Sequence, residues 1–379
     1  MTEEISFGAG MKCRPEDITH VWDRVRVPLG ERSYEILIGP GLLTEIPARL
    51  REIGMENRLF VVTDSNVEDF LGQDLLELLK AEGFKVDLLD FPAGEESKNM
   101  DTVLMLARRL VRLGADRSSV LLALGGGVTG DICGFLASIY MRGIPFVQLP
   151  TTLLAQVDSS VGGKTGVDLP EGKNLVGTFA QPAAVFADIG VLTTLPAAEL
   201  RNGIAEVVKY GMITDSDFFK FLEEKWWDII NLEPETTSFI VKRSCQIKAD
   251  VVSRDEKEGG LRRILNFGHT IGHAVEAVSG YTMPHGEAVS IGMVAVSRIS
   301  LSRGMMTRDE LDRLRSLLEQ FRLPVDIPAD MDRQEIVRHM KRDKKVRDGR
   351  LHFILTKGIG ETVIVNDVTK EELEMALGA

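Results

Sequence analysis

Three of the chain's six histidines, His269, His273 and His285, fall within residues 269–285. His269 and His273 are four residues apart in LNFGHTIGHAVE, a spacing that puts both side chains on one face of a helix. His285 follows a turn marked by residues 281–284, so the chain can fold back toward the other two. Histidine clusters are typical of zinc sites, although a pair four residues apart also occurs on helix surfaces that bind nothing.

The neighbouring residues favour a metal site. Two glycines that permit close approach and two polar residues flank the histidines: Gly268, Gly272, Asn266 and Glu287. A catalytic zinc usually keeps three protein ligands and one open position. Local spacing suggests His269 and His273 as a ligand pair, and a carboxylate could complete the set. AEVVKYG (205–211) places Glu206 three residues before Lys209 on an otherwise apolar helix face, and a buried pair of this kind is costly unless it has a task. Sequence alone does not connect Glu206 to the histidines.

A glycine loop follows an apolar run in LLALGGGVTGD (121–131), where Gly125, Gly127 and Gly130 have G-x-G-x-x-G spacing. Such a loop lets the backbone approach a pyrophosphate at a helix N-terminus, but it is also compatible with a plain tight turn. The acidic residue expected about twenty positions later is missing, because the next strand ends in Gln148-Leu149-Pro150. Asp64, at the end of an earlier predicted strand, is the better candidate for a ribose hydroxyl.

Candidate anion-binding side chains are scattered along the chain. GGKTGVDLPEGKN (162–174), predicted as a long glycine-rich loop, carries Lys164, Lys173 and Asn174. Arg262 and Asn266 are four apart and are expected to share a helix face with the histidines. Taken singly, each cation is more often a solvated surface charge. The remaining candidates are Arg142, Lys248, Lys344 and Lys345.

The elements that must position these residues change character near Pro196. Before it, buried strand patterns alternate with helical ones, which predicts a mostly parallel sheet covered by helices. The predicted elements are a hairpin in 25–39, strands at 58–64, 85–91, 118–127 and 145–150, and helices at 66–82, 100–113 and 132–141. After it, helical periods dominate, at 199–212, 217–229, 236–253, 266–279, 286–303, 308–321 and 332–343, with strands only at 351–355 and 362–365. We therefore predict an arm at 1–22, an α/β domain at 23–196 and a mainly helical domain at 197–379.

Composition excludes several classes of protein. The formal net charge of −12 argues against general nucleic-acid binding, although a few clustered cations can still hold an anion. No signal peptide or membrane span is expected from the acidic start and the short apolar runs. The cysteines, Cys13, Cys133 and Cys245, are odd in number and scattered, so a reducing cytoplasm is the expected location.

The chain resembles the 3-dehydroquinate synthase family of sugar-phosphate cyclases over roughly residues 25–365. The shared motifs occur in family order: GGGVTGD, MRGIPFVQLPTTLLAQVDSSVGGKTGVD, GKNLVGTF, RNGIAEVVKYG, GLRRILNFGHTIGHAVE, HGEAV and DKK. The resemblance implies an N-terminal NAD-binding α/β domain, a helical metal-binding domain, an active site between them, and a homodimer. The same architecture serves iron-dependent alcohol and glycerol dehydrogenases, so the fold alone does not decide the function.

The resemblance also assigns roles to individual residues. It implies that zinc or cobalt is bound by Glu206, His269 and His285, which frees His273 for proton transfer and replaces the local pair. NAD is expected to contact Asp64, Asn66, Glu95, Lys98, Gly126, Gly127, Asp131, Thr151, Thr152, Lys173 and Thr194. Further catalytic groups are Asp158, Lys209 and Glu258. Substrate is expected to contact Lys164, Asn174, Lys248, Arg262, Asn266 and one or both of Lys344 and Lys345, with Arg142 reaching across the dimer.

The implied reaction converts 3-deoxy-D-arabino-heptulosonate 7-phosphate to 3-dehydroquinate and phosphate. Transient oxidation by NAD acidifies a neighbouring C–H, phosphate is eliminated, the hydride returns, and the ring opens and closes again through carbon. A cyclase for a neutral sugar phosphate, such as a valiolone or deoxy-inosose synthase, is an alternative. A net dehydrogenase of the glycerol dehydrogenase type is another. Lys248 with Arg262 favours an acid substrate, because a neutral sugar has no carboxylate to pair with them.

Overall fold

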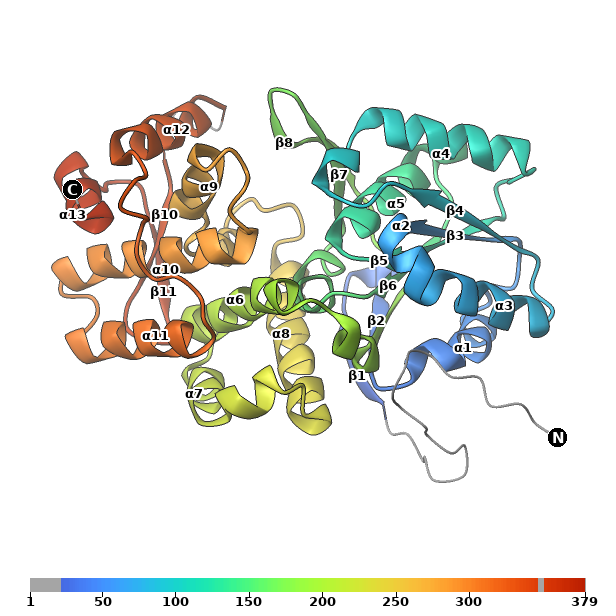
Figure 1. Ribbon diagram of the computed structural model, residues 1–379, viewed down its shortest axis with the longest axis horizontal. Coiled ribbons are helices and arrows are strands. Elements are labelled where there is room, and N and C mark those ends of the chain that lie inside the picture. The colour runs from blue at the N-terminus through green and yellow to red at the C-terminus, as the bar shows by residue number, and fades with distance from the viewer. Residues whose placement is uncertain (1–21, 347–350, 379) are drawn as a thin grey trace. The chain divides into compact units, whose positions relative to one another are not determined.

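The computed structural model describes residues 22–346 and 351–378, and the side chains of residues 341–346 lie outside that description. The predicted arm therefore lies outside the described residues except for Trp22, as do the side chains of Lys344 and Lys345. The chain divides into two compact units, one ending at Leu195 and the other beginning at Pro196. Each unit is coloured continuously in Figure 1, blue to green for the first and yellow-green to red for the second.

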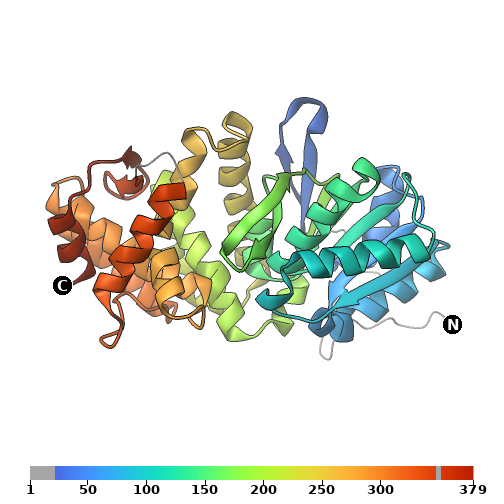
Figure 2. The same ribbon diagram turned by 90° about the horizontal axis from the view of Figure 1, so that it is seen from above.

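The first unit is built on a seven-stranded sheet with the order β1-β2-β9-β6-β5-β3-β4. Its strands are β1 (Asp23–Val27), β2 (Tyr34–Gly39), β3 (Leu59–Asp64), β4 (Val86–Phe91), β5 (Val120–Gly125), β6 (Phe146–Pro150) and β9 (Ala184–Asp188). Only β1 and β2 pair antiparallel, as the predicted hairpin, and this hairpin extends outward from the sheet in Figure 2. The central strands are buried along their whole length, as expected where helices cover both faces of a parallel sheet.

Two hydrophobic cores lie on the two faces of this sheet. One contains apolar residues of α1 (Ile46–Glu52) and α3 (Gln73–Ala81), and the other contains those of α4 (Met100–Arg112) and α5 (Gly127–Ile139). The helix predicted at 66–82 is interrupted, because α2 (Ser65–Val67) and a π-helical turn at Glu68–Gly72 precede α3. The helix predicted at 132–141 begins earlier, at Gly127, directly in the glycine loop.

The prediction of a loop at 162–174 is wrong, because this segment belongs to an antiparallel hairpin of β7 (Lys164–Leu169) and β8 (Gly172–Phe179). Its glycines are needed inside the strands rather than between them. Gly166 pairs with Gly177, and a Cβ added to Gly166 would lie 2.5 Å from the carbonyl oxygen of Val176. Glycine content, which normally indicates a loop, hid the strand pattern here.

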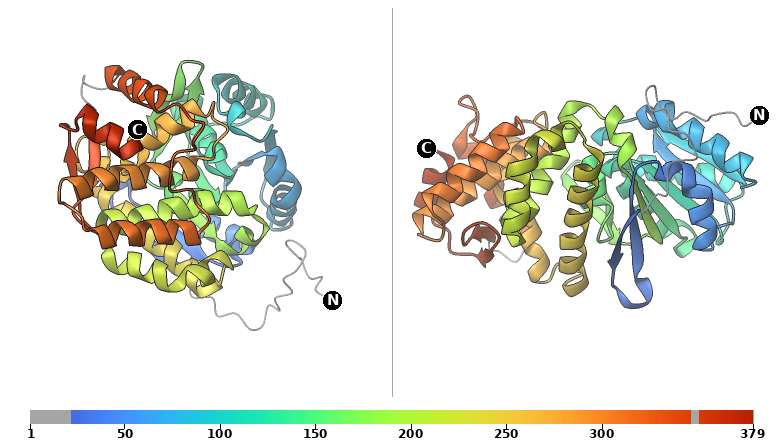
Figure 3. Two further views of the ribbon diagram at one scale, coloured as in Figure 1. Left: turned by 60° about the vertical axis from the view of Figure 1, so that its left-hand side comes forward. Right: turned by 90° about the horizontal axis from the view of Figure 1, so that it is seen from below.

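The second unit is mainly helical, and its described residues include a small hairpin of β10 (Phe353–Thr356) and β11 (Thr362–Val365). Its helices are α6 (Ala197–Thr214), α7 (Ser216–Ile230), α8 (Pro234–Arg254), α9 (His269–Val278), α10 (His285–Ser302), α11 (Arg308–Gln320), α12 (Arg333–Val346) and α13 (Lys370–Leu377). Helix α10 is buried almost all round and packs against α6, α9, α11, α13 and β10. The left view of Figure 3 shows the helices of this unit in colours from yellow-green to red. An apolar helix of this kind forms the centre of its domain.

Short helical turns connect these elements. The 3-10 turns are Gly30–Arg32, Leu42–Glu45, Glu95–Ser97, Tyr140–Arg142, Ile189–Thr194 and Leu261–Asn266, and a second π-helical turn covers Ala155–Ser159. Within the described parts of the chain, none of the helices combines the length and the apolar character that crossing a bilayer requires.

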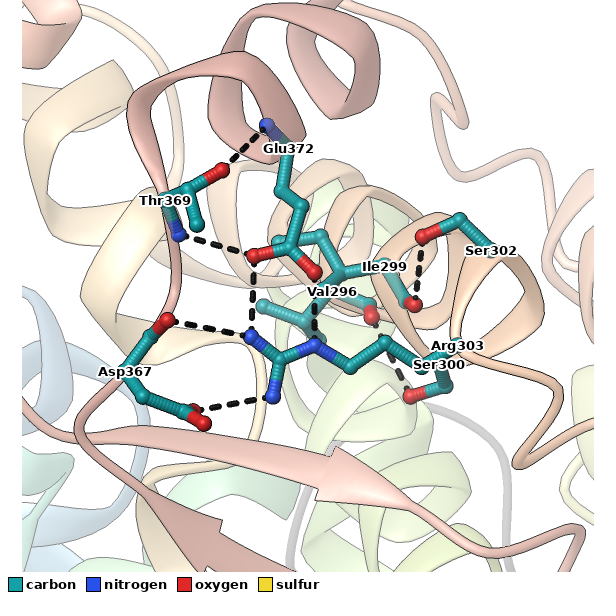
Figure 4. Close-up of polar contacts among 8 residues, drawn as sticks. All are labelled: Val296, Ile299, Ser300, Ser302, Arg303, Asp367, Thr369 and Glu372. Atoms are coloured by element: carbon teal, nitrogen blue, oxygen red, sulfur yellow. Dashed lines mark hydrogen bonds and ion pairs between the residues drawn. The ribbon is translucent and has the colours of Figure 1, made fainter.

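Helix α13, which was not among the helices predicted from the sequence, is fixed to the end of α10 by Arg303 (Figure 4). The Arg303 guanidinium donates to both carboxylate oxygens of Glu372, at 2.6 and 2.8 Å, and to Asp367 at 2.9 Å. Thr369 and Glu372 also form a reciprocal capping box at the start of α13. Hydrogen bonds from Arg303 lower the pKa of Glu372 to about 2.

Because the pKa of Glu372 is depressed in the folded protein, its stabilising effect should be present above its ordinary pKa of 4.5 and lost as the pH falls toward about 2. We expect Glu372→Gln to lower the free energy of unfolding by about 1–2 kcal/mol at pH 7. Denaturant titrations from pH 7 to pH 3 measure this difference, which should shrink below pH 4.5. Glu374→Gln removes an exposed ion pair with Lys370 and is the control. A wild-type-to-variant difference that stays constant with pH would contradict the assignment.

Candidate functional site

Glu206, His269 and His285 come together in the second unit. Glu206 lies within α6 and is 1% exposed, while His269 and His285 are the first residues of α9 and α10. The Oε1 atom of Glu206 is 3.3 Å from Nε2 of His269 and 3.7 Å from Nε2 of His285. One potential ligand atom from each residue lies within 4.8 Å of the others. Ligands about 2.0–2.2 Å from one metal ion would be spaced in this way.

Close packing of α9 on α10 produces this arrangement. A Cβ on Gly292 would collide with the carbonyl oxygen of Gly268, and one on Gly272 would lie 2.9 Å from the carbonyl oxygen of Ala288. Glycine is therefore required where the two helix backbones touch. The start of α10 is also fixed to α6, because the side-chain oxygen of Asn202 accepts a hydrogen bond from the N–H of Gly286 at 2.8 Å.

The charges around Glu206 suit a cation. Burial would raise the pKa of the Glu206 carboxyl, but Lys209 and then His269 hold it well below its ordinary value. Lys209 is itself buried and forms an ion pair with Glu206. The Oε2 atom of Glu206 is the partner of Lys209, and Oε1 faces the Nε2 atoms of His269 and His285. A buried carboxylate oxygen beside two imidazole nitrogens is a donor set that suits zinc or cobalt.

His273 lies beside this cluster but outside it. Its ring centre is 5.2 Å from that of His269 and 5.9 Å from that of His285, and the residue is exposed. Among the described residues, the groups with metal-ligand spacing place His273 with Glu276 and His285, not with His269. The local pairing of His269 with His273 is therefore not the geometry observed.

A second group of predicted residues lies around the loop between α8 and α9. Lys248 on α8 and Arg262 are both almost fully buried. The Asn266 amide donates to Glu258 at 2.7 Å, and the Arg262 guanidinium donates to the carbonyl oxygen of Glu256. Residues 261–266 form a 3-10 turn, so the expectation that Arg262 and Asn266 share a helix face is wrong. With three residues per turn, side chains four apart point about 120° from each other.

In the first unit, the predicted nucleotide-binding residues gather at the carboxyl ends of adjacent strands. Asp64 ends β3, the glycine loop ends β5, and Thr151 and Thr152 follow β6, the next strand in the sheet. The Asp64 carboxylate caps the following turn and accepts a hydrogen bond from Thr129 of α5 at 3.2 Å. Parallel α/β sheets bind ligands at this edge.

The Gly126 and Gly127 backbone opens α5, so its first N–H groups face the same edge as Asp64. Thr152 lies against Gly126, where an added Cβ would be 3.2 Å from the threonine methyl group. Asn66 follows Asp64 in the capped turn, and Thr194 ends the 3-10 turn after β9. These positions together provide an edge on which a dinucleotide can lie.

The remaining predicted residues of this unit lie mostly around the β7–β8 hairpin. The buried Lys98 ammonium is 2.7 Å from Asp131 and donates to the Asn174 side chain at 2.7 Å. Burial lowers the pKa of Lys98, but Asp131 and Glu95 raise it by more. Lys173 lies 3.7 Å from Glu95. Lys164 opens β7, Asp158 lies in the π-helical turn, and Arg142 is exposed at the end of a 3-10 turn.

Comparison with known proteins decides the family. Residues 88–202 match the model of the 3-dehydroquinate synthase N-terminal part, and residues 203–346 match that of the C-terminal part. A 3-dehydroquinate synthase of Thermodesulfovibrio yellowstonii is 45% identical over 356 residues, covering 94% of this chain and 99% of that protein. The chain belongs to the 3-dehydroquinate synthase family.

Two solved structures of sugar-phosphate cyclases share the fold of this 3-dehydroquinate synthase family member. One is 2-epi-5-epi-valiolone synthase from Streptomyces hygroscopicus subsp. jinggangensis with NAD+ and Zn2+ bound, with 34% identity, a TM-score of 0.85, and coverage of 91% of this chain and 95% of that one. The other is 2-deoxy-scyllo-inosose synthase with carbaglucose-6-phosphate, NAD+ and Co2+, with 28% identity, a TM-score of 0.86, and coverage of 94% and 99%.

Sequence reasoning missed two residues that shape the site of this 3-dehydroquinate synthase family member. Asp255 accepts hydrogen bonds from the N–H groups of Gly259, Gly260 and Arg262, at 2.7–2.9 Å, and so holds the loop that carries Glu258. Glu276 lies 3.5 Å from Nδ1 of His285. Its position three residues after His273 and seven after His269 is the signal that could have revealed it.

If the contact between α9 and α10 creates the metal site, Gly292→Ala should disrupt it. The added methyl group would push the helices apart, separate His269 from His285, and lower the free energy of unfolding by about 1–3 kcal/mol. Zinc binding by isothermal titration calorimetry and denaturant unfolding measure the two effects. Gly72→Ala is the control, because the atoms nearest to its added methyl group belong to the side chains of Leu88 and Glu68 and not to a neighbouring backbone. Wild-type zinc affinity in Gly292→Ala would show that the helix contact does not set the ligand geometry.

Proposed function

We propose that this protein is a 3-dehydroquinate synthase that converts 3-deoxy-D-arabino-heptulosonate 7-phosphate into 3-dehydroquinate and phosphate. The observation that carries this proposal is the buried Glu206 carboxylate facing His269 and His285 in a chain of this family. We assign NAD binding to residues 23–196 and metal and substrate binding to residues 197–379. A net dehydrogenase of a neutral polyol needs no buried cations such as Lys248 and Arg262 to hold an anion, and this favours the lyase.

The described residues fit both cofactors that related cyclases bind. Glu206, His269 and His285 would hold zinc or cobalt, which acts as a Lewis acid on a substrate oxygen. NAD, the transient hydride acceptor, would be held at the strand ends by Asp64, by the glycine loop and by the other predicted NAD residues around them. The support is the buried Glu206 carboxylate, whose Oε1 atom faces Nε2 of His269 and His285, and the N–H groups that open α5.

The chain's own side chains would bind substrate and move protons. Lys248 and Arg262, both buried, would hold the substrate carboxylate, with Asn266 and Glu258 beside them. Exposed His273, next to the metal cluster, would carry protons to and from solvent. Lys209 would keep Glu206 ionised. Phosphate would be held by Lys164, Asn174, Arg142 and one or both of Lys344 and Lys345, and Asp158 is the further catalytic candidate.

The proposal includes a homodimer in the cytoplasm, with Arg142 serving the partner's site. Met141, Arg142 and Gly143 all have positive φ angles, of 49°, 72° and 122°. Non-glycine residues in this region cost about 1–3 kcal/mol each, so the segment is held in a strained form that exposes Arg142. Ile139 and Met141 beside it are also exposed, at 44% and 40%, as expected for part of an interface.

Turnover should require NAD only in catalytic amounts. With the heptulosonate phosphate as substrate, phosphate and dehydroquinate should form in equal amounts while absorbance at the NADH wavelength stays flat. Chelation should abolish turnover, and added zinc or cobalt should restore it. NADH accumulating one for one with product would support a dehydrogenase instead. Turnover only of a neutral sugar phosphate would support a valiolone or inosose synthase.

Lys248 and Arg262 together form the proposed carboxylate clamp, and truncating either side chain should affect catalysis more than folding. Loss of one charged hydrogen bond to substrate costs about 2–5 kcal/mol, so kcat/KM should fall at least about 30-fold in Lys248→Ala and in Arg262→Ala. Arg262→Lys keeps the positive charge but loses the two parallel N–H donors of the guanidinium, so its kcat/KM should also be reduced. Arg254→Ala, an exposed cation on the same helix as Lys248, is the control. Near-normal kcat/KM in both alanine variants, with metal content unchanged, would remove the clamp and the argument for an acid substrate.

A further inference from the structure

Glu276 is a buried carboxylate to which neither the residues of the expected metal site nor those of the substrate site assign a role. It is 5% exposed on α9, whose other residues include no Asp, Glu, Lys or Arg. Its Oε2 atom lies 3.5 Å from Nδ1 of His285 on α10. Burying a carboxylate is unfavourable unless a partner compensates it, so this contact requires an explanation.

The His285 ring lies between two carboxylates. Its Nε2 atom faces Glu206 at 3.7 Å, and its Nδ1 atom faces Glu276 at 3.5 Å. An acceptor at Nδ1 keeps the proton on that nitrogen and leaves the Nε2 lone pair directed at Glu206. The His285 side chain is 30% exposed, so packing alone fixes this ring less firmly than that of His269, which is 12% exposed.

His269 has an equivalent partner, but of a different kind. Its Nδ1 atom is 3.1 Å from the backbone carbonyl oxygen of Phe267. Both histidines of the cluster therefore present Nε2 to Glu206 while an acceptor occupies Nδ1. The acceptor for His269 is neutral and belongs to the backbone, whereas the acceptor for His285 is an ionisable side chain that can be replaced by mutation.

We propose that Glu276 is a positioning residue that orients His285 and strengthens it as a metal ligand. This inference rests on the metal site of the proposed function. A carboxylate behind a ligand histidine fixes its tautomer and increases its basicity, and its loss typically weakens metal binding about 10–100-fold. Glu276 is not itself a ligand of the ion that Glu206 and His269 would hold, because it faces the opposite edge of the His285 ring.

A second cation between His273, Glu276 and His285 is the competing explanation, since these three residues also have ligand spacing. It would require His285 to bind one ion through each nitrogen and so to lose both ring protons. A neutral imidazole has one lone pair on nitrogen available for a metal, and the Nε2 atom already faces Glu206. A single ion with Glu276 behind its ligand is therefore the simpler arrangement.

The test is zinc binding to the full chain. The zinc dissociation constant is measured by competition with a chromophoric chelator, and the number of bound ions by elemental analysis. Wild-type protein should bind one zinc ion, and Glu276→Gln should bind one ion about 10–100-fold more weakly. Glu276→Asp, which keeps the charge but shortens the side chain, should also bind more weakly, and it replaces Glu276→Gln if that variant does not fold.

A matched control exists on α12, where Glu335 lies 3.7 Å from Nε2 of His339. Glu335→Gln removes a carboxylate from a histidine outside the cluster and should leave the zinc dissociation constant unchanged. Wild-type affinity in both Glu276 variants would overturn the inference while leaving the metal site in place. Two ions in wild type and one in Glu276→Gln would make Glu276 a ligand instead. A wild-type chain that binds no zinc would overturn the metal assignment itself.

Discussion

The burial of one carboxylate, that of Glu206, constrains how α6, α9 and α10 pack together. At 1% exposure this group must be compensated, and Lys209, His269 and His285 surround it. The two histidines reach it only because α9 and α10 touch through glycine, and α10 in turn is fixed to α6 by Asn202. An apolar residue at position 206 would remove the desolvation penalty, but Lys209, His269 and His285 would then have no carboxylate to surround. A buried carboxylate held in this way is costly for stability alone, and this supports the proposed cation site.

In the first unit, the topology of the sheet brings the residues of the candidate site together. Parallel pairing of β3, β5 and β6 brings their carboxyl ends to one edge, and with them Asp64, the glycine loop and the threonines after β6. Lys98 then connects this edge to the β7–β8 hairpin through Asp131 and Asn174. Lys98 and Asp131, which are expected to contact NAD, and Asn174, which is expected to contact substrate, are thus joined by polar contacts.

Local patterns predicted the parts of the fold that depend on local physics. The apolar runs of β3 and β5 and the periods of α8 and α11 were sufficient, because burial dictates both residue type and spacing there. The β7–β8 hairpin was missed because Gly166 and Gly177, which allow the two strands to approach closely, give the segment the glycine content typical of a loop. Glu206 could be joined to the histidines only through family resemblance, since the contact between α6 and α9 is not local. Arg262 was expected to share an α-helical face with Asn266, but residues 261–266 form a 3-10 turn. Over six residues, the sequence does not distinguish these two kinds of helix.

The most direct test of this account is a crystal structure of the zinc-loaded protein with anomalous diffraction data on both sides of the zinc edge. We expect one anomalous peak, bonded to a carboxylate oxygen of Glu206 and to Nε2 of His269 and His285, with His273 outside bonding distance and Glu276 against Nδ1 of His285. A peak bonded to His269 and His273, or to Glu276, would contradict it.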